Sequence, residues 1–432
     1  MGTAYTGRLP VLLRWLEEAG AEVFCLQELS EESFMARKVL ISGASIAGCA
    51  TAWWLERYGF DVVVVEEAPK FRDGGQNVDI RGAGRQVLDR MGLEEDALRS
   101  GTGEEGTAWI GEDGKIVAQF DQDDTGNDGP TAEMEILRGD LARLLYDRCK
   151  DKTQFRFGDT IASIRDEGTG ARVDFESGTT EQFELVIIAE GVGSATRELL
   201  FPRENQPRWL DMSIAYFTIP RTDDDDKLWR WYHTTGGRGI SLRPDQHGTT
   251  RAMLSVQRPT EGEQDWSTLR QKEWLHKEFA DAGWEARRVL AAMNKTEDFY
   301  FDALRQVKMP RWSNGNVVLT GDAAWCVTPL GGVGATLAVV GAYILAGELS
   351  KTEDIPQAFT AYEGRLRHYV EKAQDIPKVA PRLANPHSHL GLAILHGTLK
   401  LASAPGIRDF FGKLLSGKAK DIELPEYDDG TM

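Results

Sequence analysis

Two glycine-containing turns, far apart in the chain, carry the residues whose types and spacing are best suited to chemistry. The first is Gly43-Ala44-Ser45-Ile46-Ala47-Gly48, and the second runs from Gly321 to Gly334 as GDAAWCVTPLGGVG. Each turn follows a short apolar run and opens a helical stretch, so backbone N–H groups at both turns can point at one ligand. The pattern predicts a site for an anionic or electron-rich group, with the acid Asp322 beside it.

The first turn is a G-x-S-x-x-G form of the glycine-rich turn that binds dinucleotides. Gly43 permits the tight turn, Gly48 lets the following helix pack closely on the strand, and Ser45 replaces the middle glycine with another small residue. Ser45 is not expected to be a hydrolase nucleophile, because the G-x-S-x-G spacing is missing. The contacts that this turn offers to a cofactor are Gly43, Ser45, Ile46, Ala47 and Gly48.

The elements around this turn favour a dinucleotide site over the alternative, a purely structural strand-to-helix turn. Val39-Leu40-Ile41 is a short apolar run typical of a strand, and Ala47–Tyr58 has helical composition. The run Val62-Val63-Val64-Val65 indicates a second strand that is buried on both faces. Glu66 ends this βαβ unit, where its carboxylate can accept hydrogen bonds from ribose hydroxyls and disfavours a 2′-phosphate.

The second turn distinguishes among the cofactors that a dinucleotide fold can bind. A nicotinamide dehydrogenase does not need a second ligand-facing turn so late in the chain, whereas FAD is long enough to touch both turns. The adenine half would lie at the first turn and Glu66, and the isoalloxazine would reach the second. Asp322 can bond a ribityl hydroxyl, and backbone donors around Gly332–Gly334 can stabilise negative charge on the reduced flavin.

From Lys38 to about Lys372 the sequence resembles the group A flavoprotein monooxygenases, the family of para-hydroxybenzoate hydroxylase. It is also similar to tetracycline-inactivating monooxygenases and polyketide hydroxylases. The resemblance rests on three motifs in order: the first turn with Glu66, a D-G type segment at Glu190–Arg197, and G-D-A-A with P-x-G-G-x-G in the second turn. It implies that NADH or NADPH reduces FAD, that O₂ adds at flavin C4a, and that the hydroperoxide hydroxylates an aromatic or polycyclic substrate.

The resemblance also implies cofactor contacts for individual residues. These are Glu66 at the adenosine ribose, Asp79 and Arg138 at FAD, Asp322 at the ribityl chain, and Pro329, Gly332, Val333 and Gly334 along the flavin ring. Arg72 and Arg81 are further candidates for contacts to NAD(P)H or to phosphate. Two residues depart from the family pattern: Glu190 replaces the usual aspartate, and Glu67 stands where an arginine often follows the ribose acid. The nicotinamide preference therefore stays open.

The middle of the chain has the alternation of antiparallel strands with one wet face, at Ser213–Ile219, Leu228–His233, Ile240–Leu242 and Arg251–Gln257. The family fold implies that this inserted sheet covers the flavin and binds the substrate. Candidate pocket residues are Tyr216, Phe217, Trp229, Trp231, His233 and Trp325. The alternative is that these side chains simply form core. No catalytic side chain is assigned, because the oxidant is made on the cofactor.

Other outcomes of the same cofactor stay open at this stage. Baeyer–Villiger insertion is the nearest variant of hydroxylation and is distinguished by its product. A FAD-dependent reductase or dehydrogenase without oxygen insertion is a rival, and so is a FAD-binding protein that has lost turnover, which Glu190 and Glu67 make conceivable.

Composition excludes several classes of function. The net charge of −18 in 432 residues argues against nucleic acid and anionic membrane surfaces as partners. Four cysteines far apart, with no C-x-x-C pair, imply neither a metal site nor a disulfide framework and fit a cytoplasmic protein. The apolar stretch Leu330–Gly347 is interpreted as a buried helix rather than a membrane span. The partners expected are a small molecule and O₂, and the chain is a monomer or a homodimer.

The predicted fold class is α/β: a discontinuous Rossmann-like FAD-binding domain with an inserted antiparallel-sheet substrate domain and C-terminal helices. The expected boundaries are 38–200 and 313–375 for the FAD-binding domain, 201–312 for the substrate domain, and 376–432 for C-terminal helices and tail. Residues 1–34 resemble the start of an exonuclease III-type endonuclease without the rest of that fold, and are treated as an extension. Leu424–Met432 is expected to be a loose acidic tail.

Overall fold

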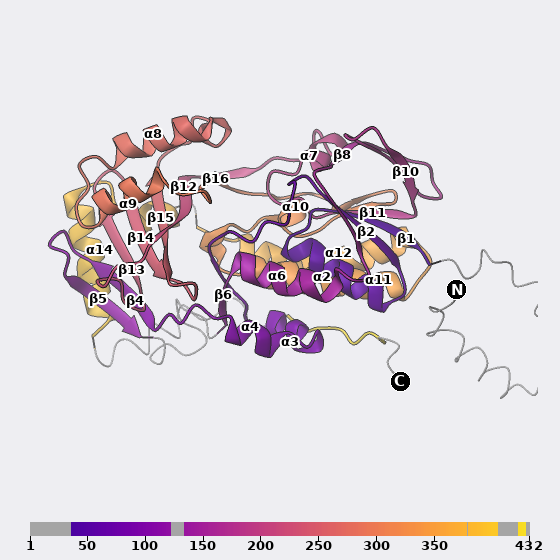
Figure 1. Cartoon of the computed structure of the whole chain (residues 1–432), viewed down its shortest axis with the longest axis horizontal. Coiled ribbons are helices and arrows are strands. Elements are labelled where there is room, and N and C mark those ends of the chain that lie inside the picture. Colours follow the sequence, from indigo (N-terminus) through magenta and orange to yellow (C-terminus); the bar gives the residue numbers. More distant parts are fainter. Residues whose placement is uncertain (1–35, 122–133, 378, 405–421, 429–432) are drawn as a thin grey trace, which may run out of the picture.

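The computed structural model describes residues 36–121, 134–377, 379–404 and 422–428 (Figure 1). The extension predicted at residues 1–34 lies outside this part of the chain. Within it, two sheets dominate the molecule and lie at its two ends, as Figure 1 shows. The predicted α/β class is confirmed.

The first sheet has six strands and contains the glycine-rich turn. Its order is β17 (Ser313–Asn314), β18 (Val317–Leu319), β11 (Leu185–Ile188), β1 (Lys38–Ser42), β2 (Asp61–Glu66) and β7 (Gln154–Phe157). All neighbours are parallel except β17 and β18. Leu40 lies between Val186 and Val63 in this register, and all three are buried. Such runs of branched apolar residues suit strands that are covered on both faces.

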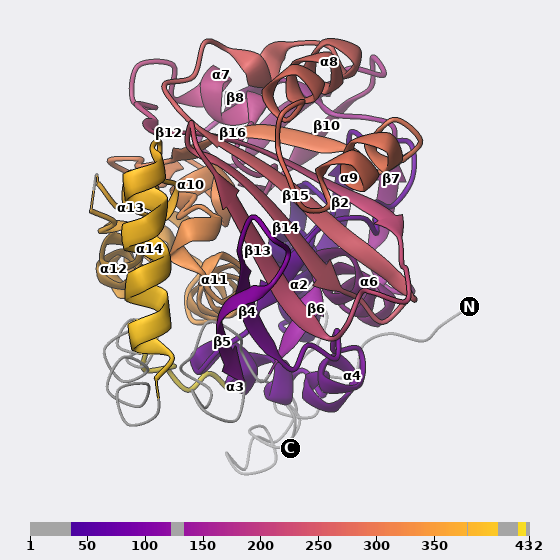
Figure 2. The ribbon, with the colours of Figure 1, turned by 90° about the vertical axis from the view of Figure 1, so that its left-hand side faces the viewer.

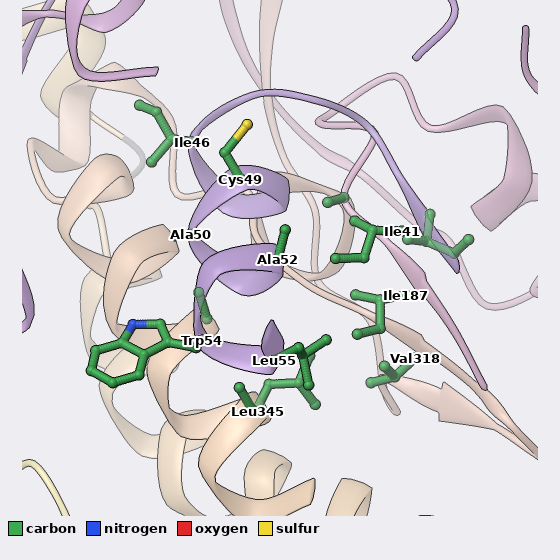
Figure 3. Packing of buried hydrophobic residues seen from close by; sticks show 14 of the residues in the cluster. Ile41, Ile46, Cys49, Ala50, Ala52, Trp54, Leu55, Ile187, Val318 and Leu345 are labelled. Atoms are coloured by element: carbon green, nitrogen blue, oxygen red, sulfur yellow. The ribbon is translucent and has the colours of Figure 1, made fainter. Parts of the chain in front are cut away.

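Four long helices cover one face of this sheet and a small second sheet covers the other (Figure 1). The helices are α2 (Ile46–Arg57), α6 (Arg138–Cys149), α11 (Gly334–Ser350) and α12 (Ile355–Gln374). The small sheet is made of β8 (Ile161–Asp166), β9 (Ala171–Phe175) and β10 (Thr180–Phe183). Figure 3 shows Ala52 and Leu55 of α2 on the side toward Ile187 and Val318, with Leu345 of α11 nearby. Helix α11 is buried nearly all round, as its sequence without charge before Glu348 predicts.

A two-stranded ribbon and several short helices complete this part of the fold. They are β3 (Asn77–Asp79), β6 (Glu135–Leu137), α3 (Ala83–Arg90), α4 (Glu94–Arg99), α7 (Ala195–Leu200) and α10 (Asp322–Trp325). The ribbon is antiparallel, with Val78 opposite Ile136. Helix α3 contacts α11, so the ribbon and α3 border the start of α11.

The second large sheet has seven strands and is the inserted sheet that the sequence predicts. Its order is β16 (Tyr300–Gln306), β12 (Arg208–Pro220), β15 (Thr249–Gln257), β14 (Arg238–Pro244), β13 (Leu228–Thr234), β4 (Gly106–Ile110) and β5 (Ile116–Asp121). The neighbours are antiparallel except β13 and β4. Strands β4 and β5 belong to the range expected for the FAD-binding domain. They join this sheet because Ala108 and Ile110 enter its apolar core.

The two faces of this sheet have different neighbours. Helices α8 (Thr268–Glu278) and α9 (Ala286–Met293) pack on the face that carries Phe217, Tyr232 and Ile240. The opposite face carries the residues one position away along each strand, because side chains alternate in a strand.

The C-terminal part of the chain returns to both sheets. Helix α14 (His389–Ala402) contacts β13 and β5, and the short helix α13 (Ala380–Ala384) contacts β12. Residues 422–428 then lie along α11, where the Tyr427 hydroxyl donates to Glu348 Oε1 at 2.6 Å. Tyr427 is 9% exposed, so the expectation of a loose tail from Leu424 is wrong for residues 424–428. The acidic composition of this segment predicts a solvated tail, but burial of the Tyr427 ring holds it against α11.

Candidate flavin and substrate site

The carboxyl ends of four parallel strands bring the sequence motifs to one edge of the six-stranded sheet. Gly43 follows β1, Glu66 ends β2, Glu190 follows β11, and Asp322 follows β18. Ligands of open α/β sheets bind at this edge. The two turns that are far apart in the sequence are therefore close in the fold.

The geometry of the first turn requires glycine at both ends. Gly43 has a φ of +109°, and a Cβ atom there would lie 2.5 Å from the carbonyl oxygen of Ala189. A Cβ atom at Gly48 would lie 1.8 Å from the carbonyl oxygen of Gly43. The start of α2 thus packs directly against the turn. No side chain caps this helix, so its first N–H groups are left for a ligand.

Glu66 is anchored beside this turn. Its Oε2 accepts a hydrogen bond from the backbone N–H of Ala44 at 2.9 Å, and its Oε1 accepts from Ala68 N at 3.1 Å and from Arg72 at 3.0 Å. Glu66 is 8% exposed, whereas the Arg72 side chain is 68% exposed. Arg72 is therefore a partner of Glu66 in this structure, and most of its side chain is exposed.

Arg138, at the start of α6, is hydrogen-bonded to the first turn and lies within electrostatic reach of Asp322 in the second. Its guanidinium donates to Ser45 Oγ at 2.9 Å and to the carbonyl oxygen of Gly74 at 3.3 Å. Burial lowers the pKa of Arg138, while the nearby charges of Asp322 and Glu66 oppose that effect. The acids of both predicted cofactor turns therefore lie within electrostatic reach of one arginine.

The second turn holds strained and unsatisfied groups. Thr328 has a φ of +69°, which is costly for a β-branched residue and is typical of functional sites. Its Oγ1 is buried without a hydrogen-bond partner among the described residues. Pro329–Gly331 forms a single 3-10 turn, and α11 then begins at Gly334 without a side-chain cap. This turn also presents free backbone donors.

Asp322 and Tyr300 are accessible to solvent although many protein atoms surround them. Asp322 is exposed and Tyr300 is 49% exposed, yet burial among protein atoms raises the pKa of both groups. Arg138 opposes the shift of Asp322, and the charges of Asp302, Arg138 and Asp322 also act on Tyr300.

Glu190, which follows β11, is a hydrogen-bond acceptor for residues of two neighbouring elements. Its carboxylate accepts hydrogen bonds from Ser42 Oγ at 2.6 Å, Ser194 Oγ at 2.7 Å, and the Thr196 hydroxyl and N–H at 2.6 and 3.1 Å. The longer glutamate therefore ties the end of β1 to the start of α7. Arg197, which is 3% exposed, donates to the carbonyl oxygen of Ala323 at 3.1 Å and fixes α10.

A row of side chains crosses one face of the seven-stranded sheet, from Tyr300 on β16 to Trp109 on β4. The pairing of strands places Tyr300 opposite Tyr216, and Trp231 opposite Ser241, on one face. The complete row, in order across the sheet, is Tyr300, Tyr216, Met253, Ser241, Trp231 and Trp109. Trp229 lies two residues along from Trp231, with ring centroids 4.8 Å apart, and its Nε1 donates to Ser241 Oγ at 2.5 Å.

Two of the predicted pocket residues do not lie on this face of the sheet. Phe217 is 2% exposed and packs with Phe299 on the face that α8 and α9 cover, because it is one position away from Tyr216 in β12. Trp325 is 2% exposed and lies 4.4 Å from the Trp312 ring, in the core under the second turn. For both residues the alternative of plain core is the one that the structure supports.

His233 lies further along the same strand face. Its ring stacks on Trp231 with centroids 5.8 Å apart, and its Nδ1 has no hydrogen-bond partner among the described residues. It is 5% exposed, and burial, with a smaller effect from His396, lowers its pKa to about 4. His233 is therefore neutral near pH 7.

Asp79 and Arg81 lie where the ribbon meets the inserted sheet. The two side chains form an ion pair at 2.9 Å, and Arg81 N donates to Thr336 Oγ1 near the start of α11. Arg243, from β14, faces the same region. Burial raises the pKa of Asp79, and the charge of Arg243 opposes that shift.

Arg243 is the centre of a buried charge cluster that the sequence did not reveal. Its Nε donates to Glu104 Oε2 at 2.5 Å, its Nη2 lies 2.6 Å from Glu135 Oε2 without the angle of a hydrogen bond, and its guanidinium lies 3.9 Å from the Trp229 ring. Burial, aided by the nearby Glu135, raises the pKa of Glu104 to about 8. The cluster joins β14 to β6 and so connects the two large parts of the fold.

No pattern in the sequence singles out Tyr300 as a site residue. It lies on β16, which follows a helical stretch and has a mixed polar pattern, so neither a strand nor a face was assigned. Thr328 and Arg197 lie within motifs that were found. Their roles depend on backbone angle and burial, which no spacing rule reports.

The fold and the paired turns define a FAD-binding flavoprotein, and comparisons with known proteins agree. The model of a family described as FAD binding domain matches residues 36–382. Monooxygenase CTB7 of Cercospora beticola is 34% identical over 416 residues, which cover 92% of this chain and 99% of that protein. An uncharacterized protein of Mycobacterium tuberculosis is 37% identical over 355 residues, covering 80% and 95%.

A solved structure agrees with these relatives. The crystal structure of tetracycline destructase Tet(51) superposes with a TM-score of 0.77 at 29% identity, covering 91% of this chain and 100% of that chain. This chain belongs to the FAD-binding domain family and is a flavoprotein monooxygenase of group A. Its cofactor is FAD.

The residues at the two turns fit FAD on their own chemistry. The first turn has room only for hydrogen at Gly43 and Gly48, and Glu66 offers a buried carboxylate. The second turn holds the unpartnered Thr328 hydroxyl beside uncapped N–H groups of α11. In the described residues no group of three or more His, Cys, Asp or Glu side chains is placed to hold a metal ion. None of the described helices is long and apolar enough to cross a membrane.

Proposed function

We propose that this monooxygenase uses NADH or NADPH and O₂ to hydroxylate an aromatic or polycyclic small molecule. The observation that carries the proposal is the meeting of three parts of the chain. Arg138, which donates to Ser45 of the first turn, and Asp322 of the second turn both act electrostatically on Tyr300, which begins the row of side chains on the inserted sheet. A substrate on that row would therefore lie next to the flavin.

The chain's own residues would bind and orient the reactants. We propose Gly43, Ser45, Ile46, Ala47 and Gly48, with Glu66, Asp79, Arg138, Asp322, Pro329, Gly332, Val333 and Gly334, as the contacts to FAD. Uncapped N–H groups at α2 and α11 favour the negative charge of the pyrophosphate and of the reduced ring. When bound, FAD takes electrons from the nicotinamide and activates O₂.

The face of the inserted sheet suits a flat substrate. Trp229, Trp231 and Tyr216 offer aromatic surfaces, against which fused rings stack favourably. Burial raises the pKa of Tyr300, so it is protonated at neutral pH; its hydroxyl donates to Asp302 Oδ2 at 3.5 Å, and its oxygen can accept a hydrogen bond from a substrate. His233 is neutral and buried, so its unpartnered nitrogen can serve a polar group of the substrate.

The test is turnover by the FAD-loaded enzyme. Phenols, quinones, tetracyclines and other polyketides are each added with NADH or NADPH, and oxidation of the nicotinamide and uptake of O₂ are followed together. Tetracyclines belong in the first set because a similar solved structure is that of a tetracycline destructase. Mass spectrometry after reaction under ¹⁸O₂ should find one labelled oxygen in the product.

Each competing function gives a different result in the same experiment. A reductase or dehydrogenase would convert its substrate without O₂ and leave the product unlabelled. Baeyer–Villiger insertion would give an ester or lactone instead of a hydroxylated ring. A chain that binds FAD without turnover would show no bleaching of the flavin by either nicotinamide. Labelled hydroxylation coupled to nicotinamide oxidation supports the proposal, and its absence with all four substrate classes would overturn it.

A further inference from the structure

Helix α14 is held firmly against the inserted sheet by its inner side. Leu392 and Ala402 are each 6% exposed, and the helix contacts β13 and β5. The segment before it is tied to the turn between β13 and β14, since Gly236 N donates to His387 O and Gly237 N to Pro386 O, both at 3.1 Å. Ser388 caps the helix through Gly391 N at 3.2 Å. The orientation of α14 is therefore fixed by the fold.

The outer side of α14 presents an apolar stripe, which consists of Leu390, Ile394, Gly397 and Leu401. The three large side chains are 72%, 61% and 60% exposed. A Cβ atom at Gly397 would meet no heavy atom within 4 Å. The steps of four, three and four residues are those of a helix that packs along another helix. Figure 2 shows α14, in yellow, with one side turned away from the sheet.

We propose that this stripe binds the same stripe of a second copy of the chain, with the two α14 helices antiparallel. The stripe is symmetric about the point midway between residues 395 and 396. A twofold axis at that point places Leu390 opposite Leu401 of the other copy, and Ile394 opposite Gly397. The glycine leaves space for the larger isoleucine, so the surface complements itself, as a twofold interface requires.

Charge also favours a second copy over a membrane surface. The chain carries a net charge of −18, which repels other copies over most of its surface, whereas α14 contains no acidic residue and one lysine, Lys400. The antiparallel alignment places Lys400 opposite Gly391 rather than opposite another cation. A helix that lies on an anionic bilayer carries several Lys or Arg residues on its polar face, and α14 does not.

The size of the stripe indicates a weak, reversible dimer. From Leu390 to Leu401 the stripe spans about 16 Å at about 1.5 Å per residue. A stable interface buries about 800 Å² on each partner, more than one short helix pair supplies. Leu383 and Val379, which are 70% and 60% exposed in and just before α13, are further exposed apolar side chains of this part of the chain. The dimer should therefore form in the micromolar concentration range.

The experiment is sedimentation velocity of the full-length, FAD-loaded protein across the micromolar range. The wild type should shift from monomer to dimer as concentration rises. Ile394→Asp should weaken the dimer at least tenfold, because it places a carboxylate in the centre of the stripe. Leu269→Asp is the matched control, since Leu269 is 70% exposed on α8, and it should leave the dimer unchanged. Equal FAD content and circular dichroism verify that the variants fold.

Cross-linking tests the direction of the helices. A mixture of Leu390→Cys and Leu401→Cys proteins should form a disulfide-linked dimer on mild oxidation, whereas either variant alone should form much less. A wild-type protein that stays monomeric throughout the concentration range overturns the proposal. So does a dimer that survives Ile394→Asp, or one in which Leu390→Cys cross-links to itself as well as the mixture does. In the first case the stripe is covered by this chain's own residues or is simply solvated.

Discussion

Adding one methyl group at Gly48 tests the predicted cofactor turn directly. The Cβ of Gly48→Ala would lie 1.8 Å from the Gly43 carbonyl oxygen, whereas an ordinary contact is at least 3.4 Å. The start of α2 must therefore move by more than an ångström relative to the turn. That oxygen belongs to the backbone and has no rotamer that relieves the clash, so we expect the apoprotein to lose about 1–3 kcal/mol of unfolding free energy.

The cost to FAD should be at least as large. Backbone hydrogen bonds to an anion depend steeply on distance, and a movement of an ångström takes such a bond beyond its useful range. Losing one hydrogen bond to a charged group costs about 1.5–3 kcal/mol. The dissociation constant of FAD should therefore rise by about 10- to 100-fold, since each 1.4 kcal/mol is a factor of ten.

The measurement is a titration of apoprotein with FAD, followed by quenching of flavin fluorescence, together with urea unfolding of each variant. Gly364→Ala is the matched control, because Gly364 lies within α12, has no positive φ, and a Cβ there meets nothing within 4 Å. That variant should bind FAD normally and gain up to about 1 kcal/mol of stability. A Gly48→Ala protein with wild-type affinity and stability would refute the assignment of this turn.

Three further substitutions test other parts of the structure. Asp322→Ala should weaken FAD retention by about 10-fold or more, because it removes a charged hydrogen-bond acceptor; a variant purified with its full complement of flavin would count against Asp322 as a ribityl ligand. Burial raises the pKa of Glu104 from 4.5 in the unfolded chain to about 8, so between these values the folded protein keeps a proton that the unfolded chain has lost. The unfolding free energy should therefore fall as pH rises through this window, by at most about 1.4 kcal/mol per pH unit, and Glu104→Gln should flatten urea unfolding against pH; an unchanged slope would contradict a buried neutral Glu104. A Cβ at Gly347 would lie 2.3 Å from the Tyr427 ring, so Gly347→Ala should displace residues 422–428, cost about 1–3 kcal/mol, and expose the C-terminal segment to limited proteolysis, with wild-type resistance as the refuting result.

The parts of the fold that could be predicted are those in which local sequence and global structure agree. The buried strands and α11 are predicted from apolar runs next to glycines. The expected helix starts at Ala335, and α11 begins one residue earlier, at Gly334. Strands β12 to β15 were visible because their alternation is regular. The sequence of the edge strand β16 does not predict a strand, because Tyr300–Gln306 mixes charged with apolar residues.

The site shows the same division. The acids and glycines of the two turns follow from chemistry that any flavin requires. The face on which an aromatic side chain lies follows from register, and a shift of one residue exchanges the faces, so Phe217 and Tyr216 could not be separated by composition. The Arg243 cluster could not be predicted either. Its three ionisable members come from β14, the segment before β4, and β6, and only tertiary packing brings them together.

The order of the strands has a consequence for how the protein is made. The sheet that holds the cofactor takes β1 and β2 from the beginning of the described chain and β18 from beyond residue 315, and Tyr427 closes over α11 later still. The first glycine turn, Gly43–Gly48, therefore leaves the ribosome long before the second turn, Gly321–Gly334, has been made. The nascent protein has to keep the apolar edge of β11 from other chains until β18 arrives, and both turns of the proposed FAD site are present only when synthesis has nearly finished.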